Sequence, residues 1–262
     1  MLDSLPPARR RLAVAVAALL GLVVLAVAAV VVSRTLTAPD AVPQSEPGPV
    51  VVVPGYGGGT TALRPLVLAL GYQGREVAVL PPADDNTGDL DAQAERLTAF
   101  VDGVIEREDA ASVDVVGYSA GGVVARLWVR DHGGAAKARR VLTVGSPHHG
   151  TSVAALATQA VGCPVACEQL TPDSDLLRRL NGGDETPDGP LWATVRSSSD
   201  QVVTPTDSAE LDGADVNVLV QDLCPDERAS HGDLPGDPVT LAMLTSVLGT
   251  SAPQAPRDVP CR

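Results

Sequence analysis

Apolar residues at positions 50–248 of the chain follow two patterns in alternation, short continuous runs and helical spacing. Short runs rich in valine and leucine predict six buried strands, at 50–53, 76–80, 113–116, 140–144, 192–196 and 216–220. Apolar residues at helical spacing predict helices between and after them, at 63–70, 90–105, 120–130 and 238–248. Strands that alternate with helices of about 10–15 residues are typical of a parallel sheet covered on both faces. The pattern therefore predicts an α/β fold, with residues 50–262 as its domain.

The longest apolar run lies before this domain, from Leu12 to Val32, and contains 21 residues without a charge. A helix of that length rises about 31 Å, which is enough to cross a hydrocarbon core of about 30 Å. Arg9, Arg10 and Arg11 precede the run, so residues 1–11 should stay in the cytoplasm. We therefore predict a single transmembrane signal-anchor helix over residues 12–32.

A cleaved signal peptide is the alternative interpretation of this segment. Small residues around 36–38 could form a cleavage site, although signal peptides usually have an apolar stretch of only about 7–15 residues. The next segment, 33–49, contains four prolines and is expected to be an extended linker. Both interpretations place the domain outside the cytoplasm, either anchored to the membrane or secreted.

Composition and charge exclude some classes of function. Hydrophobic residues make up 45% of the chain and charged residues 19%, which indicates a folded core. The net charge is −13, and beyond residue 32 there are 16 Lys and Arg against 31 Asp and Glu, a net charge of −15. A domain this acidic would repel a phosphate backbone, so nucleic acid is excluded as a partner. The oligomeric state cannot be inferred from the sequence.

All four cysteines lie in the domain. An even number of cysteines in an exported chain favours two disulfides over metal binding or thiol catalysis, with four free buried thiols as the alternative. Three pairings are possible, and we favour Cys163–Cys167 and Cys224–Cys261, because the second would secure the C-terminal tail. No histidine pair accompanies Cys163 and Cys167, and the acidic residues at 84–91 lack the glycine position of an EF-hand. We therefore expect no bound metal.

A nucleophile motif follows the third predicted strand. Residues 117–121 read Gly-Tyr-Ser-Ala-Gly, which fits the pattern G-x-S-x-G between a buried strand and a helix. A serine on such a sharp turn stands clear of the sheet, and the small flanking residues let neighbouring backbone pass close to it. The sequence therefore predicts Ser119 as a catalytic nucleophile.

Serine needs a base to remove its proton, and the chain has only four histidines. His132 lies 13 residues beyond Ser119 on the same predicted helix, about 20 Å along its axis, and is too distant. His148 and His149 precede every plausible acid. His231 follows the last predicted strand, and the order nucleophile, acid, base that is expected of this architecture selects it.

The acid should lie between Ser119 and His231, at the carboxyl end of a strand. Asp200 follows the predicted strand 192–196 in such a turn, and its alternative role is to cap that turn. The later aspartates at 207, 212 and 215 lie in segments that look like solvated turns. Two N–H groups should hold the oxyanion, that of Ala120 and that of Tyr56 in the glycine-rich loop after the first strand. This loop does not fit the spacing of a P-loop.

The stretch from Ser152 to Leu170 has two interpretations. It is rich in alanine and is interrupted by Pro164. It could be an ordinary packing helix, or it could form part of a flap over the site where the acyl group binds.

Five segments together resemble the bacterial class 2 lipases, a family of triacylglycerol lipases and esterases with the α/β-hydrolase fold. Many members of that family have His and Gln where this chain has Tyr118 and Ala120. The matching segments extend over nearly the whole domain: 53–58 (VPGYGG), 115–122 (VVGYSAGG), 145–151 (GSPHHGT), 199–205 (SDQVVTP) and 230–235 (SHGDLP).

The resemblance implies a small, nearly lidless hydrolase that acts on fatty-acyl or other carboxylic esters without a cofactor. It also implies a triad of Ser119, Asp200 and His231. A cell-envelope acyltransferase with the same triad, or a silent hydrolase fold used as a binding module, would share most of these features. Only the enzymes need all three side chains to meet.

Overall fold

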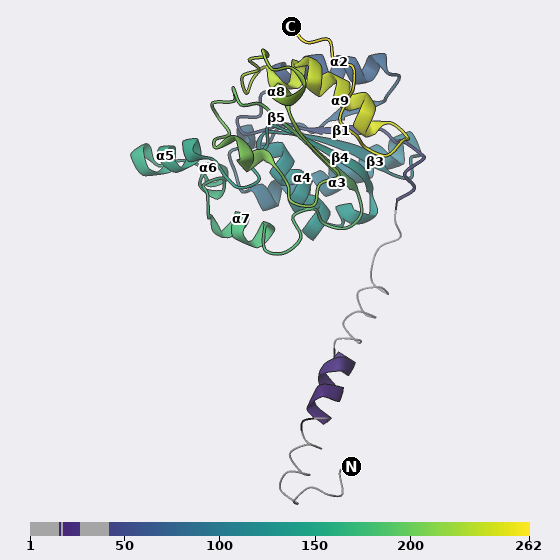
Figure 1. The fold of residues 1–262 in the computed structure, drawn as a ribbon, viewed down its shortest axis with the longest axis vertical. Helices are drawn as coiled ribbons and strands as arrows, with labels where there is room; N and C mark the ends of the chain where they lie inside the picture. Colours follow the sequence, from purple (N-terminus) through teal and green to yellow (C-terminus); the bar gives the residue numbers. More distant parts are fainter. Residues whose placement is uncertain (1–15, 17, 27–41) are drawn as a thin grey trace, which may run out of the picture. The chain divides into compact units, whose positions relative to one another are not determined.

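The fold was obtained as a computed structural model, which describes residues 16, 18–26 and 42–262 (Figure 1). Six parallel strands form one sheet in the order β2-β1-β3-β4-β5-β6. All six strands predicted from the sequence are present, with ends shifted by at most two residues. They are β1 (Val50–Val53), β2 (Val77–Val79), β3 (Val113–Tyr118), β4 (Ala138–Val144), β5 (Leu191–Arg196) and β6 (Val216–Leu219).

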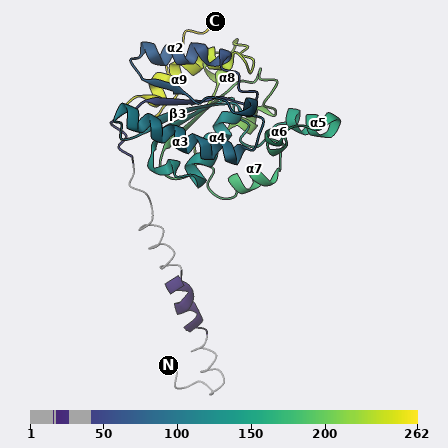
Figure 2. The ribbon, with the colours of Figure 1, turned by 180° about the vertical axis from the view of Figure 1, so that it is seen from behind.

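Helices cover both faces of the sheet, as predicted. The views in Figures 1 and 2 place α2 (Arg64–Tyr72), α8 (Val220–Leu223) and α9 (Pro238–Leu248) over one face, and α3 (Leu90–Glu108) and α4 (Ala120–Asp131) over the other. Successive side chains of a strand point to opposite faces, so both faces of β1 are buried. Val51 and Val53 pack into the core beside α3 and α4, whereas Val50 and Val52 pack into the core beside α2 and α9.

Aspartates begin two of the longer helices. The Oδ1 atom of Asp89 accepts hydrogen bonds from the backbone N–H groups of Asp91 (2.8 Å) and Ala92 (3.0 Å) at the start of α3. The carboxylate of Asp237 accepts one from Val239 at the start of α9. Each cap satisfies N–H groups that have no partner within the helix.

The segment after β4 departs most from an ordinary packing helix. It forms α5 (Ser152–Val161), α6 (Val165–Gln169) and α7 (Asp175–Leu180). Of the ten residues of α5, Ala154 is the buried one, and the helix extends outward from the body of the domain in both views (Figures 1 and 2). The hypothesis of a flap therefore describes this stretch better than that of a packing helix.

The predicted helix over 12–32 and the predicted linker over 33–49 lie partly outside the described residues. Residues 16 and 18–26 are helical, and residues 1–40 form a unit separate from residues 41–262. Within the described residues, the structure has no helix that is both long enough and apolar enough to span a membrane. The signal anchor therefore stays a prediction.

Two disulfides close loops of very different length. Cys163 is bonded to Cys167, and Cys224 is bonded to Cys261, which is the pairing that the sequence favoured. The cysteines are 4 residues apart in the first pair and 37 in the second. Because the entropy lost by the unfolded chain grows with loop length, the bonds should contribute about 2 and about 4 kcal/mol respectively. The longer loop secures the C-terminal tail.

A buried group of charges stabilises the amino end of the sheet. Asp114 on β3 is completely buried, and its Oδ2 atom lies 2.6 Å from Nη2 of Arg75 and 2.5 Å from Nη2 of Arg139. Both arginines also donate to the backbone carbonyl of Leu248 at the end of α9. The carboxylate and the last turn of α9 thus share these cations, and helix C-termini favour positive charge.

Candidate active site

The nucleophile motif forms a sharp turn at the carboxyl end of β3. Ser119 follows the last residue of the strand and precedes the first residue of α4. Its backbone has φ 53° and ψ −129°, a conformation that residues other than glycine rarely adopt. Its N–H donates to the carbonyl of Val144 on β4 (2.9 Å), which ties the turn to the next strand. The turn presents the hydroxyl above the edge of the sheet.

The glycines on either side of the serine permit this turn. A Cβ atom at Gly117 would lie 2.6 Å from Cα of Gly122, and one at Gly121 would lie 2.1 Å from the carbonyl oxygen of Val53. Both distances are shorter than any van der Waals contact, and the atoms met are backbone atoms that cannot move aside. The spacing of small residues in the motif is therefore a steric requirement of the turn.

The structure brings together the three residues that the sequence nominated as a triad. Nε2 of His231 lies 3.0 Å from Oγ of Ser119, and Nδ1 lies 2.7 Å from Oδ2 of Asp200. A carboxylate only accepts hydrogen bonds, so Nδ1 carries the proton and Nε2 can accept the proton of the serine. The other oxygen of Asp200 accepts from the N–H groups of Val202 (2.8 Å) and Val203 (3.0 Å), which orients the carboxylate.

Tyr118 contacts His231 in two ways, a role that the sequence analysis missed. Its ring stacks on that of His231, with centroids 5.1 Å apart and planes inclined by 29°. Its hydroxyl donates to the backbone carbonyl of His231 (3.1 Å). Burial, together with the charges of Asp200 and Asp233, raises the pKa of Tyr118 to about 12, so the hydroxyl stays protonated. A tyrosine beside the nucleophile was noted only as a departure from the lipase pattern, because stacking is invisible in one sequence.

The glycine-rich loop after β1 lies against Ser119. A Cβ atom at Gly55 would lie 2.7 Å from Cβ of Ser119, so glycine is needed for this close approach. The buried side chain of Asn86 donates to the carbonyl of Gly55 (3.3 Å) and accepts from the N–H of Ala83 (3.1 Å). Asn86 therefore supports the loop that carries Tyr56, a role that the sequence analysis did not identify.

An apolar cavity of about 390 Å³ opens beside the serine. Ser119 and Tyr56 line it together with side chains from α5, α6 and the turn after β5. The disulfide between Cys163 and Cys167 also lines this cavity, a position that the sequence analysis did not assign to it. The aliphatic members of the lining are Val153, Ala154, Ala157, Val161, Leu170, Val202 and Val203.

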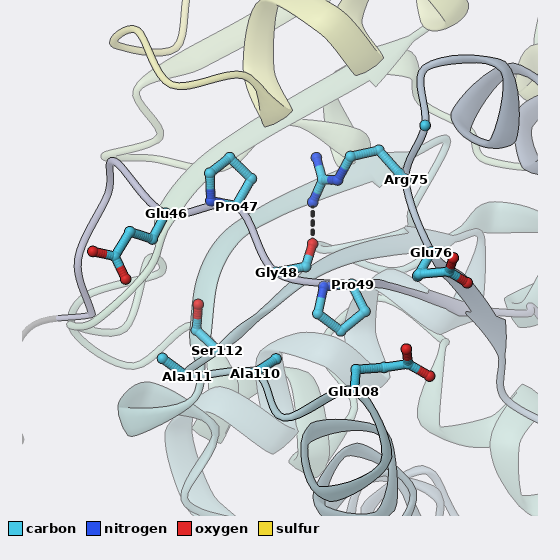
Figure 3. Close-up of a pocket in the computed structure, with 11 residues that line it drawn as sticks. Glu46, Pro47, Gly48, Pro49, Arg75, Glu76, Glu108, Ala110, Ala111 and Ser112 are labelled. Carbon is cyan, nitrogen blue, oxygen red and sulfur yellow. Dashed lines mark hydrogen bonds between the residues drawn. The ribbon is translucent and has the colours of Figure 1, made fainter.

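A second hollow, of about 410 Å³, lies at the opposite edge of the sheet (Figure 3). It is lined by residues that precede β1, β2 and β3, including Gly48, Glu76 and Ser112. The guanidinium of Arg75 in this hollow is engaged by the carbonyl of Gly48 and by Asp114. In the described part of the chain, no three His, Cys, Asp or Glu side chains are grouped as metal ligands.

The other three histidines form hydrogen bonds to residues other than Ser119. His132 pairs with Asp91 near the start of α3 (3.0 Å), which agrees with its exclusion as the base. His149 bonds to Glu185 (2.8 Å), and this hydrogen bond raises the pKa of His149. His148 is completely buried, and its Nε2 lies 2.9 Å from Oγ1 of Thr143.

His148 should make the fold sensitive to acid. Burial, reinforced by the charge of Arg126, lowers the pKa of His148 well below its usual value of 6.5. Below pH 6.5 the unfolded chain therefore binds a proton that the folded chain does not, so stability falls by up to about 1.4 kcal/mol per pH unit. Urea unfolding of wild type and His148→Gln between pH 7.5 and 5.0 should show a shallower loss in the variant. An equal loss of unfolding free energy with falling pH in wild type and His148→Gln would contradict this role. His149→Gln is the control, and its loss should be no shallower than that of wild type.

Comparisons with known proteins agree with this architecture. Aspergillus fumigatus lipase B superposes with a TM-score of 0.72 at 18% identity over 83% of this chain and 56% of that protein. This chain thus spans little more than half the length of that lipase. The mature form of the Bacillus licheniformis lipase BlEst2 superposes with a TM-score of 0.63 at 18% identity, over 81% of this chain and 95% of that protein. At these identities the likeness establishes the α/β-hydrolase fold.

A family model, and not a single curated protein, establishes the family from the sequence. Comparison with curated protein sequences gave no match. The family model described as palmitoyl protein thioesterase matches residues 49–179, which is half of the chain and includes β1, Ser119 and the α5–α6 segment. The protein therefore belongs to the palmitoyl protein thioesterase family.

Proposed function

We propose that the protein cleaves fatty-acyl esters through a covalent acyl-enzyme formed on Ser119. The hydrogen-bonded chain from Ser119 through His231 to Asp200 is the observation that carries this proposal. His231 takes the serine proton as Oγ attacks the ester carbonyl, and Asp200 stabilises the imidazolium that forms. The imidazolium then protonates the departing alcohol. Water attacks the acyl-enzyme by the same route and releases the acid.

The backbone N–H groups of Tyr56 and Ala120 are the proposed donors to the oxyanion. Ala120 is the first residue of α4, where N–H groups have no partner within the helix and the helix dipole favours negative charge. Tyr56 belongs to the loop that Gly55 brings against Ser119. Two donors held in place before the reaction stabilise the charge of the tetrahedral intermediate without further reorganisation.

An aliphatic acyl chain is the substrate group that best fits the apolar cavity. The cavity begins at Ser119 and is lined mainly by aliphatic side chains and the Cys163–Cys167 disulfide. Burying a methylene group there would contribute about 0.8 kcal/mol to binding. The name of the family refers to a palmitoyl thioesterase, so a fatty-acyl thioester is the second candidate substrate. The same triad and oxyanion donors would serve both reactions.

We place the enzyme outside the cytoplasm, held at the membrane by residues 12–32. The uncharged run from Leu12 to Val32 and the three arginines before it support this placement. The two disulfides also favour an oxidising compartment. Secretion after cleavage near residues 36–38 is the alternative.

Covalent labelling with a fluorophosphonate tests the proposed nucleophile directly. The reagent should attach to one serine, and mass spectrometry of the digested protein should locate it at Ser119. His231→Ala should label far more slowly, because the base that activates the hydroxyl is missing. Labelling at another serine, or equal rates in both proteins, would refute the proposed site. Assay of the labelled enzyme on p-nitrophenyl and thioester substrates should show loss of both activities together.

A further inference from the structure

Helices α5 and α6 form a helical hairpin that lines one wall of the cavity, and α5 packs weakly against the domain. Helix α5 supplies Val153, Ala157 and Val161 to the lining, yet Ala154 is its buried residue. An isolated helix of ten residues is marginally stable in water, so α5 depends on what holds its two ends. The chain carries no Lys, Arg, Asp or Glu between Arg140 and Glu168. Helix α5 therefore has no charged side chain with which to form an ion pair.

The first end of α5 is held by hydrogen bonds to the turn after β5. The N–H of Ser152 donates to the carbonyl of Thr204 (2.9 Å), and the hydroxyl of Thr151 donates to the carbonyl of Val202 (2.5 Å). Among the residues that the structure describes, the second end has no backbone hydrogen bond to the sheet or to the turn after β5. It continues through Gly162, in the left-handed region with φ 72°, directly into Cys163.

The disulfide joins that second end to a firmly packed element. Cys167 lies in α6, whose neighbouring residue Ala166 is completely buried and donates its N–H to the carbonyl of Thr87 (3.1 Å). Thr158 on α5 also lies 2.9 Å from the sulfur of Cys163. The bond closes the shorter of the two loops and should add about half as much global stability as Cys224–Cys261, whereas its local effect falls on α5. It connects the loose end of α5 to α6 at the cavity wall.

We infer that the Cys163–Cys167 disulfide fixes the wall against which longer acyl chains bind, and that it thereby sets the preference of the enzyme for chain length. The inference rests on the proposed function at Ser119. Chemistry occurs at the Ser119 end of the cavity, and the hairpin forms the other side. A short acyl group would leave the hairpin untouched, whereas a longer one would contact it. Each methylene buried there should raise kcat/KM by about fourfold.

The test compares p-nitrophenyl butyrate with p-nitrophenyl octanoate in the full-length protein. Replacing both cysteines (Cys163→Ser with Cys167→Ser) should lower the octanoate-to-butyrate ratio of kcat/KM by at least about tenfold. The matched control replaces the other pair (Cys224→Ser with Cys261→Ser), which lies outside the cavity lining. That control should lower the melting temperature more and leave the ratio unchanged.

A second variant addresses the wall without touching the disulfide. Ala157→Phe adds a ring to the face of α5 that lines the cavity, and it should also lower the ratio. An unchanged ratio in the double cysteine variant would overturn the inference, and so would an equal fall in the control pair. If the wild-type protein hydrolysed neither ester, the proposed function itself would be refuted, so the two failures are distinguishable.

Discussion

Ser119→Ala should lower kcat for ester hydrolysis by about 10⁴–10⁶-fold while leaving the fold intact. The variant removes the oxygen that attacks the carbonyl, and no neighbouring side chain can replace it at 3.0 Å from Nε2 of His231. The oxyanion donors and the apolar cavity remain, so a small residual rate above that in water is expected. Steady-state kinetics on p-nitrophenyl butyrate, with active-site titration to exclude contaminating hydrolases, measures the loss.

The stability of this variant is the control that separates chemistry from folding. Ser119 has a strained backbone, and alanine must adopt the same φ of 53°, so its melting temperature should change by only a few degrees. Binding of a substrate analogue should persist because the cavity is unchanged. A variant that unfolds, or one that retains more than about a tenth of the wild-type kcat, would contradict the proposed role of Ser119.

Asp114→Ala should destabilise the fold by about 3–5 kcal/mol without touching the site. The carboxylate lies between Arg75 and Arg139, and its loss leaves two guanidinium groups close together, one of them fully buried, without a counter-ion. Those arginines also hold the carbonyl of Leu248, so the last turn of α9 should loosen with them. Urea unfolding followed by circular dichroism would measure the change in the free energy of unfolding.

A surface carboxylate provides the matched control for Asp114. Asp102 on α3 pairs with Lys137, but its side chain is about half exposed (52%). Exposed ion pairs contribute only about 0–1 kcal/mol, so Asp102→Ala should be nearly neutral. Equal losses in the two variants would show that burial of the Asp114 carboxylate is not the cause. Activity measured below the unfolding transition should be similar in both variants and wild type.

The order of strands and helices, and the three candidate catalytic residues, could be predicted from the sequence alone. Local patterns carry this information, because a short continuous apolar run indicates a strand buried on both faces, and helical spacing of apolar residues indicates the buried face of a helix. The two glycines could also be recognised locally, since Gly117 and Gly121 stand within two residues of Ser119, although the atom that excludes a Cβ at Gly121 belongs to Val53 on β1. His231 and Asp200 could be selected because few alternatives remained along the chain.

Tertiary structure alone decided which distant side chains meet. The stacking of Tyr118 on His231 and the support of Gly55 by Asn86 depend on side-chain directions that a linear pattern does not encode. The Cys163–Cys167 pair could be read from spacing as a local crosslink, but its place in the cavity wall follows from how α5 folds out after β4. The apolar pattern of the sequence indicates which side of each helix or strand is buried. Which side chains of different elements touch depends on how the whole domain packs.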